Sequence, residues 1–222
     1  MSKQDIKRLE QKEKERTEKH SKPQEENKEK ASKIDVLKKW KGKDWFAILS
    51  PKSFGETFIS ETPATDSKYI AGRVIEVPVS HILNDKTKNH MKLIFKVTDV
   101  ENKKAHTRFG GFYVVREFIG RNVRRDLEKL YVVDYAETKD KWKLQITTTA
   151  ILNGKCESTI LSKSRKLISD FYKQQAANST LDDFVKNVMS SNYQKTIRKD
   201  CSKVYPVRFA EINRIEVITP GN

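Results

Sequence analysis

The chain has little of what metal proteins and disulfide-rich proteins depend on. Its two cysteines, Cys156 and Cys201, stand far apart without a C-x-x-C pair, so neither a disulfide framework nor a zinc ribbon is indicated. None of the four histidines has a cysteine or carboxylate at ligand spacing, such as H-E-x-x-H. We therefore expect a reducing compartment, no metal site and no cofactor.

Hydrophobic targeting and membrane segments are missing as well. No run of about 18 apolar residues occurs, and residues 1–10 contain neither a hydrophobic segment nor a small-residue cleavage site. We expect a soluble, intracellular and unprocessed chain that contacts no membrane.

Catalytic motifs are absent from the sequence too. Gly110-Gly111 is followed by no phosphate-loop or dinucleotide pattern, and no nucleophile, base and oxyanion donor assemble. A divalent-metal nuclease would need carboxylates such as Asp99 and Asp134 to converge on the metal ions. Acidic residues are common at strand ends and turns for backbone reasons, so we rank this hypothesis third, below the two RNA-binding functions given at the end of this section. The sequence thus predicts that the chain is not an enzyme.

Positive charge is abundant instead. Lysine and arginine number 45 against 30 acidic residues, a formal net charge of +15 over 222 residues. Such an excess favours a polyanionic partner, because basic side chains neutralise phosphates and release counterions, and arginine adds a bidentate fork. The alternative is solubility alone, since 34% charged and 36% hydrophobic residues also describe a very soluble protein.

Composition divides the chain into a tail and a body. Residues 1–33 are almost wholly Lys, Glu, Gln, Ser and Asn, and cannot bury an apolar face, so a disordered, charged tail is predicted. This tail is either an arm that orders on RNA or a solvating extension. The rest is predicted to form a single domain, 34–222, with a barrel at about 45–153, helices at about 157–204 and a final strand at about 206–218.

Short alternations of apolar and polar residues predict strands in the body. Leu93, Phe95 and Val97 would face inward, and the residues from Glu101 to Lys104 would turn the chain. A second hairpin has Tyr131, Val133 and Tyr135 alternating in its first strand and Trp142, Leu144 and Ile146 in its second. Gly110-Gly111 predicts a bulge or a sharp bend where the strand curls. One shared barrel core is expected from Trp45, Phe54, Leu93, Phe95, Trp142 and Ile146.

Helical spacing appears in four places. Around Phe118 and Ile119 one apolar side is backed by a basic stripe, Arg121, Arg124 and Arg125. Three helices follow Gly154, of which the second is capped by Ser179-Thr180 and the third ends before Pro206. The predicted class is α+β: a small, mostly antiparallel β-barrel with flanking C-terminal helices and a disordered, charged N-terminal tail.

Clusters of basic side chains are the candidate RNA-binding residues. Trp40 joins them because it lies in a lysine-rich segment and an aromatic ring can stack on unpaired bases. Each cluster taken alone is equally well explained as a solvated surface. The candidates are Lys38, Lys39, Trp40, Lys41, Lys43, Lys52, Arg121, Arg124, Arg125, Lys163, Arg165 and Lys166.

Four segments, in this order and spacing, resemble one family of ribosomal proteins. A lysine-rich entry precedes W-[FY]-x-[IV]-x-[SA]-P-x-x-F at residues 45–54, and G-R-V-x-E-V follows at 72–77. R-E-[FY]-[IL]-x-x-x-V-R-R matches 116–125, and Y-P-[LV]-R matches 205–208. Over roughly residues 40–217 the chain is similar to the archaeal and eukaryotic small-subunit proteins of the "S-three-a-e" type, the eukaryotic S-one family.

The resemblance implies a small β-barrel with flanking helices and a structural role in the small ribosomal subunit. Family members lie on the platform near the mRNA exit and touch ribosomal RNA and neighbouring small-subunit proteins, which brings mRNA within reach. The expected location is therefore cytoplasmic and ribosome-associated. The matched motifs add Arg73, Arg116 and Arg208 to the candidate RNA-binding residues. An accessory RNA-binding protein or RNA chaperone that associates transiently with RNA remains the alternative.

Overall fold

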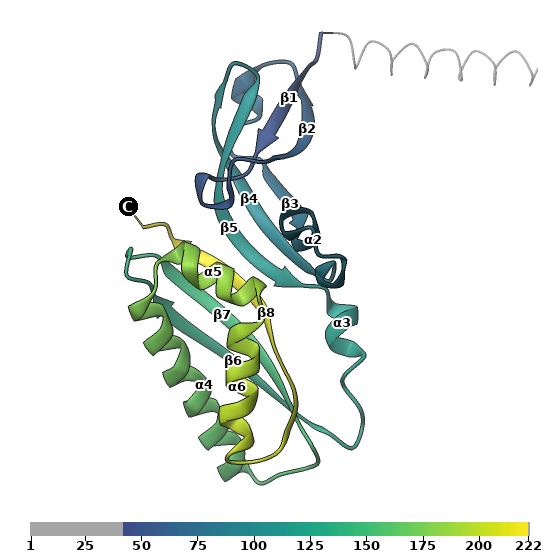
Figure 1. The fold of residues 1–222 in the computed structure, drawn as a ribbon, viewed down its shortest axis with the longest axis vertical. Coiled ribbons are helices and arrows are strands. Elements are labelled where there is room, and N and C mark those ends of the chain that lie inside the picture. The colour runs from purple at the N-terminus through teal and green to yellow at the C-terminus, as the bar shows by residue number, and fades with distance from the viewer. Residues whose placement is uncertain (1–41, 222) are drawn as a thin grey trace, which may run out of the picture. The chain divides into compact units, whose positions relative to one another are not determined.

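The structure is a computed structural model that describes residues 42–221. The tail predicted at residues 1–33 lies outside this range. The strands are β1 (Asp44–Leu49), β2 (Phe58–Ala64), β3 (Val74–Pro78), β4 (Met91–Glu101), β5 (Lys104–Val114), β6 (Glu128–Glu137), β7 (Lys143–Leu152) and β8 (Val207–Thr219). The helices are α2 (Val79–Leu83), α3 (Arg116–Gly120), α4 (Ser158–Asn178), α5 (Leu181–Met189) and α6 (Asn192–Ser202), with short 3-10 helices η1 (Lys52–Phe54), η2 (Ser67–Tyr69) and η3 (Lys86–Lys88) (Figure 1).

All eight strands belong to one sheet, and β5 is the strand that connects its parts. On one edge β5 pairs with β4 in an antiparallel hairpin. On its other edge β5 has two partners in turn, β1 at Ala105 and β8 from Gly111 to Tyr113. The strand order therefore runs β2-β1-β5-β8-β7-β6, with β4 and β3 as a branch from β5 (Figure 1).

This branched sheet is open, so the predicted barrel is not confirmed. A barrel closes when every strand pairs on both of its edges. Within residues 42–221, β2 and β6 end the strand order and β3 pairs with β4 alone. Because β5 divides one edge between β1 and β8, the strands diverge there instead of forming a ring. The α+β class with C-terminal helices is confirmed, as is mostly antiparallel pairing.

The predicted bulge at the paired glycines is confirmed, and it lies where β5 reaches its second partner. The β4–β5 register shifts between Ile94, which faces Gly111, and Phe95, which leaves Gly110 as the extra residue. A Cβ atom at Gly111 would lie 2.7 Å from the Ile215 carbonyl oxygen of β8. Only glycine therefore allows β5 and β8 to approach this closely.

Alternation along β4 separates core from surface as predicted. Leu93, Phe95 and Val97 are buried, whereas Lys96 and Thr98 are exposed. The core nevertheless consists of two clusters instead of one. The main cluster lies between helices α4 to α6 and the β6–β7–β8 layer and continues along β4 and β5, and a smaller one includes Val97.

Trp45 does not belong to the core, contrary to the prediction, because its side chain is 57% exposed. Phe46 and Ile48 of β1 are buried in the smaller cluster, and the two-residue period of a strand then directs Trp45 to the opposite face. The other predicted core residues belong to the main cluster or pack against it: Phe54, Leu93, Phe95, Trp142 and Ile146.

In β6 the predicted alternation marks the surface. Tyr131, Val133 and Tyr135 are exposed, whereas Leu130 and Val132 are buried. Both sets are apolar, so the two-residue period alone does not reveal which set faces the core. Helix α4 decides this, because it covers the face of β6 that carries the buried set.

The C-terminal helices follow their predicted patterns. In α4 the buried side chains recur every four residues, and the Tyr172 hydroxyl lies 2.6 Å from that of Thr148 on β7. Thr180 caps α5 by accepting a hydrogen bond from the Asp183 amide at 3.3 Å. The aspartate also lies in the first turn, where its charge favours the helix dipole.

Helix α3 is shorter than the predicted basic stripe requires, because it ends at Gly120. Glycine weakens a helix, and the Asn122 side chain donates to the Phe118 carbonyl at 3.0 Å, which occupies an acceptor of the last turn. The stripe therefore falls at the helix end and in the loop that follows, at Arg121, Arg124 and Arg125.

A buried carboxyl group lies between α6 and β8. Glu211 is 6% exposed, and Gln194 donates to its Oε1 at 3.0 Å. Burial raises the pKa of Glu211 to about 7, although the hydrogen bonds from Gln194 and from the Ile212 backbone oppose the shift.

The close contact at Gly111 makes a first prediction. Gly111→Ala forces its methyl group against the Ile215 carbonyl, so we expect a loss of about 1–3 kcal/mol in the free energy of unfolding. Gly120→Ala is the control, because a Cβ atom there meets nothing within 4 Å. Urea denaturation of both variants measures the difference. Equal stability of the two variants would mean that β5 and β8 are not closely packed at Gly111.

The Glu211 carboxyl makes a second prediction, on pH dependence. Its folded pKa of about 7 exceeds the unfolded value near 4.5, so the folded state holds the extra proton between these pH values. This group's contribution to stability is therefore greatest below pH about 4.5 and falls by about 3 kcal/mol as pH rises to about 7. Glu211→Gln should be increasingly more stable than wild type from pH 5 to 8 in thermal melts. Glu137→Gln, at an exposed position, is the control and should show no such trend.

Candidate nucleic-acid interface

Of the predicted RNA-binding residues that precede β2, only Lys43 and Lys52 lie within the described part of the chain. Lys38, Lys39, Trp40 and Lys41 lie outside the described residues. Lys43 is half-buried, and Lys52 is exposed in η1.

Arg73 is engaged within the protein. Its Nε donates to the Tyr69 carbonyl at 2.9 Å, and its Nη1 donates to the Thr62 hydroxyl and to the Pro63 carbonyl at 3.3 Å. These bonds hold η2 against β2 and leave the guanidinium fewer donors for a phosphate. The prediction that Arg73 binds RNA stays untested, but a structural role is evident.

The other candidates are all exposed, and several gather at one end of the β6–β7–β8 layer. There Leu152 of β7 pairs with Glu128, where β6 starts, and with Val207, where β8 starts. The Glu128 amide donates into the 153–157 loop at 3.3 Å, and this loop donates to the Pro206 carbonyl at 2.9 Å. These bonds bring three loops and the end of α6 together.

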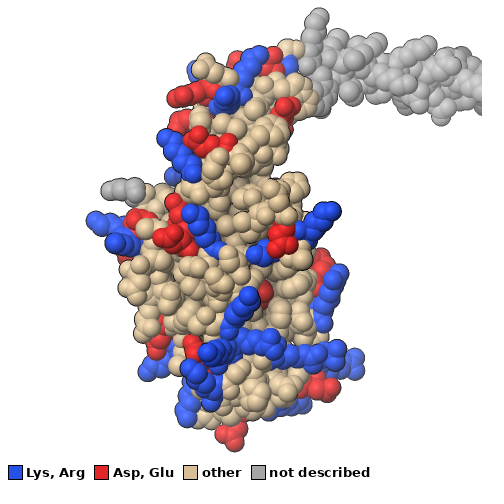
Figure 2. Space-filling model, in the orientation of Figure 1, with Lys and Arg blue, Asp and Glu red and all other residues tan. Residues whose placement is uncertain are grey.

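We call this surface the basic end and define it by five exposed residues: Arg124, Arg125, Lys155, Lys199 and Arg208. No hydrogen bond or ion pair of their side chains is found among the described residues. The candidates Lys163, Arg165 and Lys166 lie in the first half of α4, which starts at the same end. Figure 2 shows Lys and Arg side chains gathered across the corresponding lower part of the molecule, with few acidic ones between them.

Exposed, unpaired cations of this kind suit a polyanion. Phosphates can replace water around them at little desolvation cost, and each contact releases counterions. The acidic groups nearby reduce the field only in part, because Asp200 is itself paired with Lys203 at 2.8 Å. The basic end therefore has the chemistry of a phosphate-binding surface.

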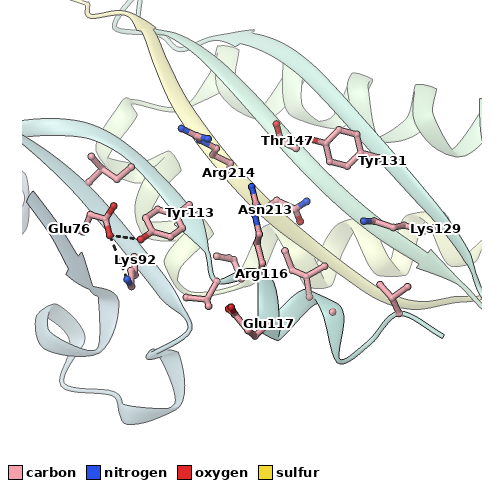
Figure 3. A pocket seen from close by; sticks show the side chains of 16 residues that line it. Glu76, Lys92, Tyr113, Arg116, Glu117, Lys129, Tyr131, Thr147, Asn213 and Arg214 are labelled. Atoms are coloured by element: carbon pink, nitrogen blue, oxygen red, sulfur yellow. Dashed lines mark hydrogen bonds and ion pairs between the residues drawn. The ribbon is translucent and has the colours of Figure 1, made fainter. Parts of the chain in front are cut away.

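A second feature is a cleft of about 770 Å³ on the sheet face opposite α4, which we call the sheet cleft. Helix α3 forms one wall, and residues of β3 to β8 line most of the remainder (Figure 3). Figure 3 shows Arg116 extending from α3 toward Asn213, with Lys129 and Tyr131 reaching in from β6. Among the predicted RNA-binding residues, only Arg116 lines this cleft.

Charges at one side of the sheet cleft are internally paired. Lys92 lies 3.5 Å from Glu76, and its Nζ lies 5.5 Å from the Tyr113 ring centroid. The Tyr113 hydroxyl donates a hydrogen bond to Glu76. The pKa of Tyr113 is raised mainly by burial and then by this hydrogen bond, so the hydroxyl stays neutral. Arg214 pairs with Glu216 across one residue of β8.

Arg116 and Lys129 differ from these paired charges, because neither side chain has a hydrogen bond or ion pair among the described residues. Both are exposed at opposite walls of the sheet cleft. Sequence reasoning identified Arg116 but missed Lys129 and Tyr131, along with Lys155 and Lys199 of the basic end. Lys129 and Tyr131 could have been identified only by knowing which side of β6 is exposed. The alternation of residues in the sequence does not determine that side.

The structure gives the nuclease hypothesis no metal site. Within residues 42–221, no group of three or more His, Cys, Asp and Glu side chains is placed to hold a metal ion. Asp134 instead accepts a hydrogen bond from Ser169 on α4 at 2.8 Å. In the same part of the chain, no helix is long and apolar enough to cross a membrane.

Comparison with known proteins gives one consistent result. The model of the Ribosomal S3Ae family matches residues 31–220. Among curated proteins, small ribosomal subunit protein eS1 of Desulfurococcus amylolyticus is 32% identical over 82% of this chain and 86% of its own length. The protein of the same name from Methanopyrus kandleri is 31% identical over 84% of this chain and 90% of its own length, and that of Aeropyrum pernix is 33% identical over 82% and 87%.

The basic end makes a third prediction, on salt dependence. If about six phosphates are neutralised, the logarithm of the affinity for structured RNA should fall against the logarithm of salt with a slope on the order of −4 to −5. Replacing Arg124, Arg125 and Arg208 with Ala should make the slope shallower by about two to three units, with the melting temperature nearly unchanged.

The matched control removes the same charge elsewhere, by replacing the exposed residues Lys68, Lys86 and Arg108 with Ala. Filter binding across a salt series measures all three proteins. An equal change of slope in both variants would show that net charge, and not the basic end, governs binding.

Proposed function

Because the chain belongs to the Ribosomal S3Ae family, we propose that it is a structural constituent of the small ribosomal subunit that binds ribosomal RNA at the platform near the mRNA exit. The observation that carries the proposal is the extent of the match, which spans residues 31–220. Relatives that are 31–33% identical over more than four fifths of the chain bear the name of a small-subunit protein. This is a family of structural ribosomal proteins and not of enzymes.

The basic end is the surface that we assign to ribosomal RNA. Arg124, Arg125 and Arg208 offer bidentate guanidinium forks, which suit phosphate oxygens better than the point charge of a lysine. Phosphate contacts fix register and orientation and carry no sequence information. The protein would therefore recognise the position and shape of folded RNA, as a structural component does, through a rigid end of the sheet.

Rigidity at the basic end comes from the backbone bonds between its loops. The loops are tied to β6, β7 and β8 by paired strand residues and by backbone hydrogen bonds. A preorganised cationic surface loses less conformational entropy on binding than a flexible one. The body, residues 34–222, would then act as one domain, and residues 1–33 as a charged arm.

Contacts with neighbouring small-subunit proteins, and with mRNA near the exit, belong to the same proposal. They rest on the family resemblance, as does a ribosome-associated location in the cytoplasm. The alternative, an accessory RNA-binding protein or chaperone, would use the same charges with weaker and transient attachment. No feature of the described residues favours it.

A fourth prediction separates these two functions. In a sucrose gradient run at high salt, the tagged chain expressed in cells should sediment with the small subunit, because an integral component is held by many contacts at once. The variant lacking Arg124, Arg125 and Arg208 should incorporate poorly, whereas the variant lacking Lys68, Lys86 and Arg108 should incorporate normally. Release of the wild-type chain to the top of the gradient would support the accessory protein instead.

A further inference from the structure

The sheet face opposite α4 is one surface across five strands. Strand register places Val133 of β6, Thr147 of β7, Arg214 of β8, Tyr113 of β5 and Lys92 of β4 in a single row. Residues paired in register project from the same side of a sheet, so this row crosses the point where β5 meets β8. The sheet cleft lies along this row, and α3 bounds it.

Tyr131 is the exposed aromatic residue that lines the sheet cleft. It stands beside the row on β6, lines the sheet cleft and is 54% exposed. Tyr113 is less accessible, because Lys92 lies over its ring and Glu76 accepts its hydroxyl proton in a hydrogen bond. An exposed aromatic ring on an open sheet face is the arrangement on which unpaired bases stack in several RNA-binding modules.

The charges beside Tyr131 favour an anionic occupant. Arg116 and Lys129 flank the cleft without partners among the described residues, and Glu117 is the acidic lining residue that has no partner among them either. The other two pairs, Lys92 with Glu76 and Arg214 with Glu216, are already neutralised. The unpaired charge is thus net positive, which a single phosphate group complements.

Asn213 of β8 adds a polar side chain to the lining of the sheet cleft. Its Nδ2 donates to the Thr149 hydroxyl at 2.7 Å, but its buried Oδ1 has no hydrogen-bond donor among the described residues. Buried acceptors are rarely left unsatisfied in native proteins. The cleft volume of about 770 Å³ lies within the range of small-ligand sites.

We propose that the sheet cleft binds an unpaired nucleotide of single-stranded RNA, with the base stacked on Tyr131 and the phosphate between Arg116 and Lys129. This deepens the proposed function, on which it rests, by assigning single-stranded RNA to the sheet cleft and folded RNA to the basic end. A protein segment docked on the same face is the competing occupant, and the matched charge and the aromatic ring favour RNA over it.

The test compares affinities of the full chain for a short oligouridine–adenosine strand and for an RNA duplex of equal length, by fluorescence anisotropy. Tyr131→Ser should weaken single-strand binding by at least about fivefold, because stacking on an aromatic ring is a substantial part of base affinity. Duplex binding should not change. Tyr131→Phe should keep wild-type affinity, since the ring remains. Tyr69→Ser, at a position that is 66% exposed in η2, is the matched control and should change neither affinity.

Each other result has a defined meaning. Unchanged single-strand affinity of Tyr131→Ser, while the variant lacking Arg124, Arg125 and Arg208 loses duplex binding, would overturn the cleft assignment and leave the proposed function in place. Loss of neither affinity in either variant would contradict both. In assembled subunits, a photoreactive phenylalanine analogue in place of Tyr131 should crosslink to RNA. A crosslink to a protein would overturn the proposal in favour of protein docking.

Discussion

The close passage of Gly111 past the Ile215 carbonyl is the contact on which the arrangement of the sheet depends. It brings β5 against β8 at a point where any side chain would be obstructed, so two groups of strands become one hydrogen-bonded surface. The bulge at Gly110 allows β5 to keep its pairing with β4 through this point. Without this contact, the β1–β5 strands and the β6–β8 layer would be linked by chain connectivity and side-chain packing alone.

A continuous sheet has two faces, and helices α4 to α6 pack against one of them. Helices α4 to α6 cover one face of β6–β7–β8 and form the main core there, with Tyr172 bonded to Thr148 and Glu211 buried beside Gln194. The opposite face keeps aromatic and cationic side chains that, within residues 42–221, no helix other than α3 borders. Two distinct chemistries follow: exposed cations for phosphates at the basic end, and an aromatic ring with flanking cations in the sheet cleft.

Several elements could be predicted because their signals are local. The period of two in β4, the cap at Thr180 and the paired glycines each depend on a few neighbouring residues, and the structure confirms them. Predictions of the buried side of a strand failed where neighbouring residues, which face opposite sides, were equally apolar. Trp45 and Phe46 compete for the core side of β1, and Tyr131 and Val132 compete in β6, so only the covering elements decide.

The sequence by itself determined the basic character, the α+β class, the helices and the family. Composition and the order of motifs can be read without knowing how the elements are arranged in space. Tertiary structure alone decided that the sheet stays open and that Arg73 bonds within the protein. It also decided that Arg124 and Arg208 lie at the same end of the sheet, and that Arg116 and Lys129 line one cleft, although different elements carry them. These are long-range pairings, and their geometry depends on strand register and backbone approach, which no local pattern of residues encodes.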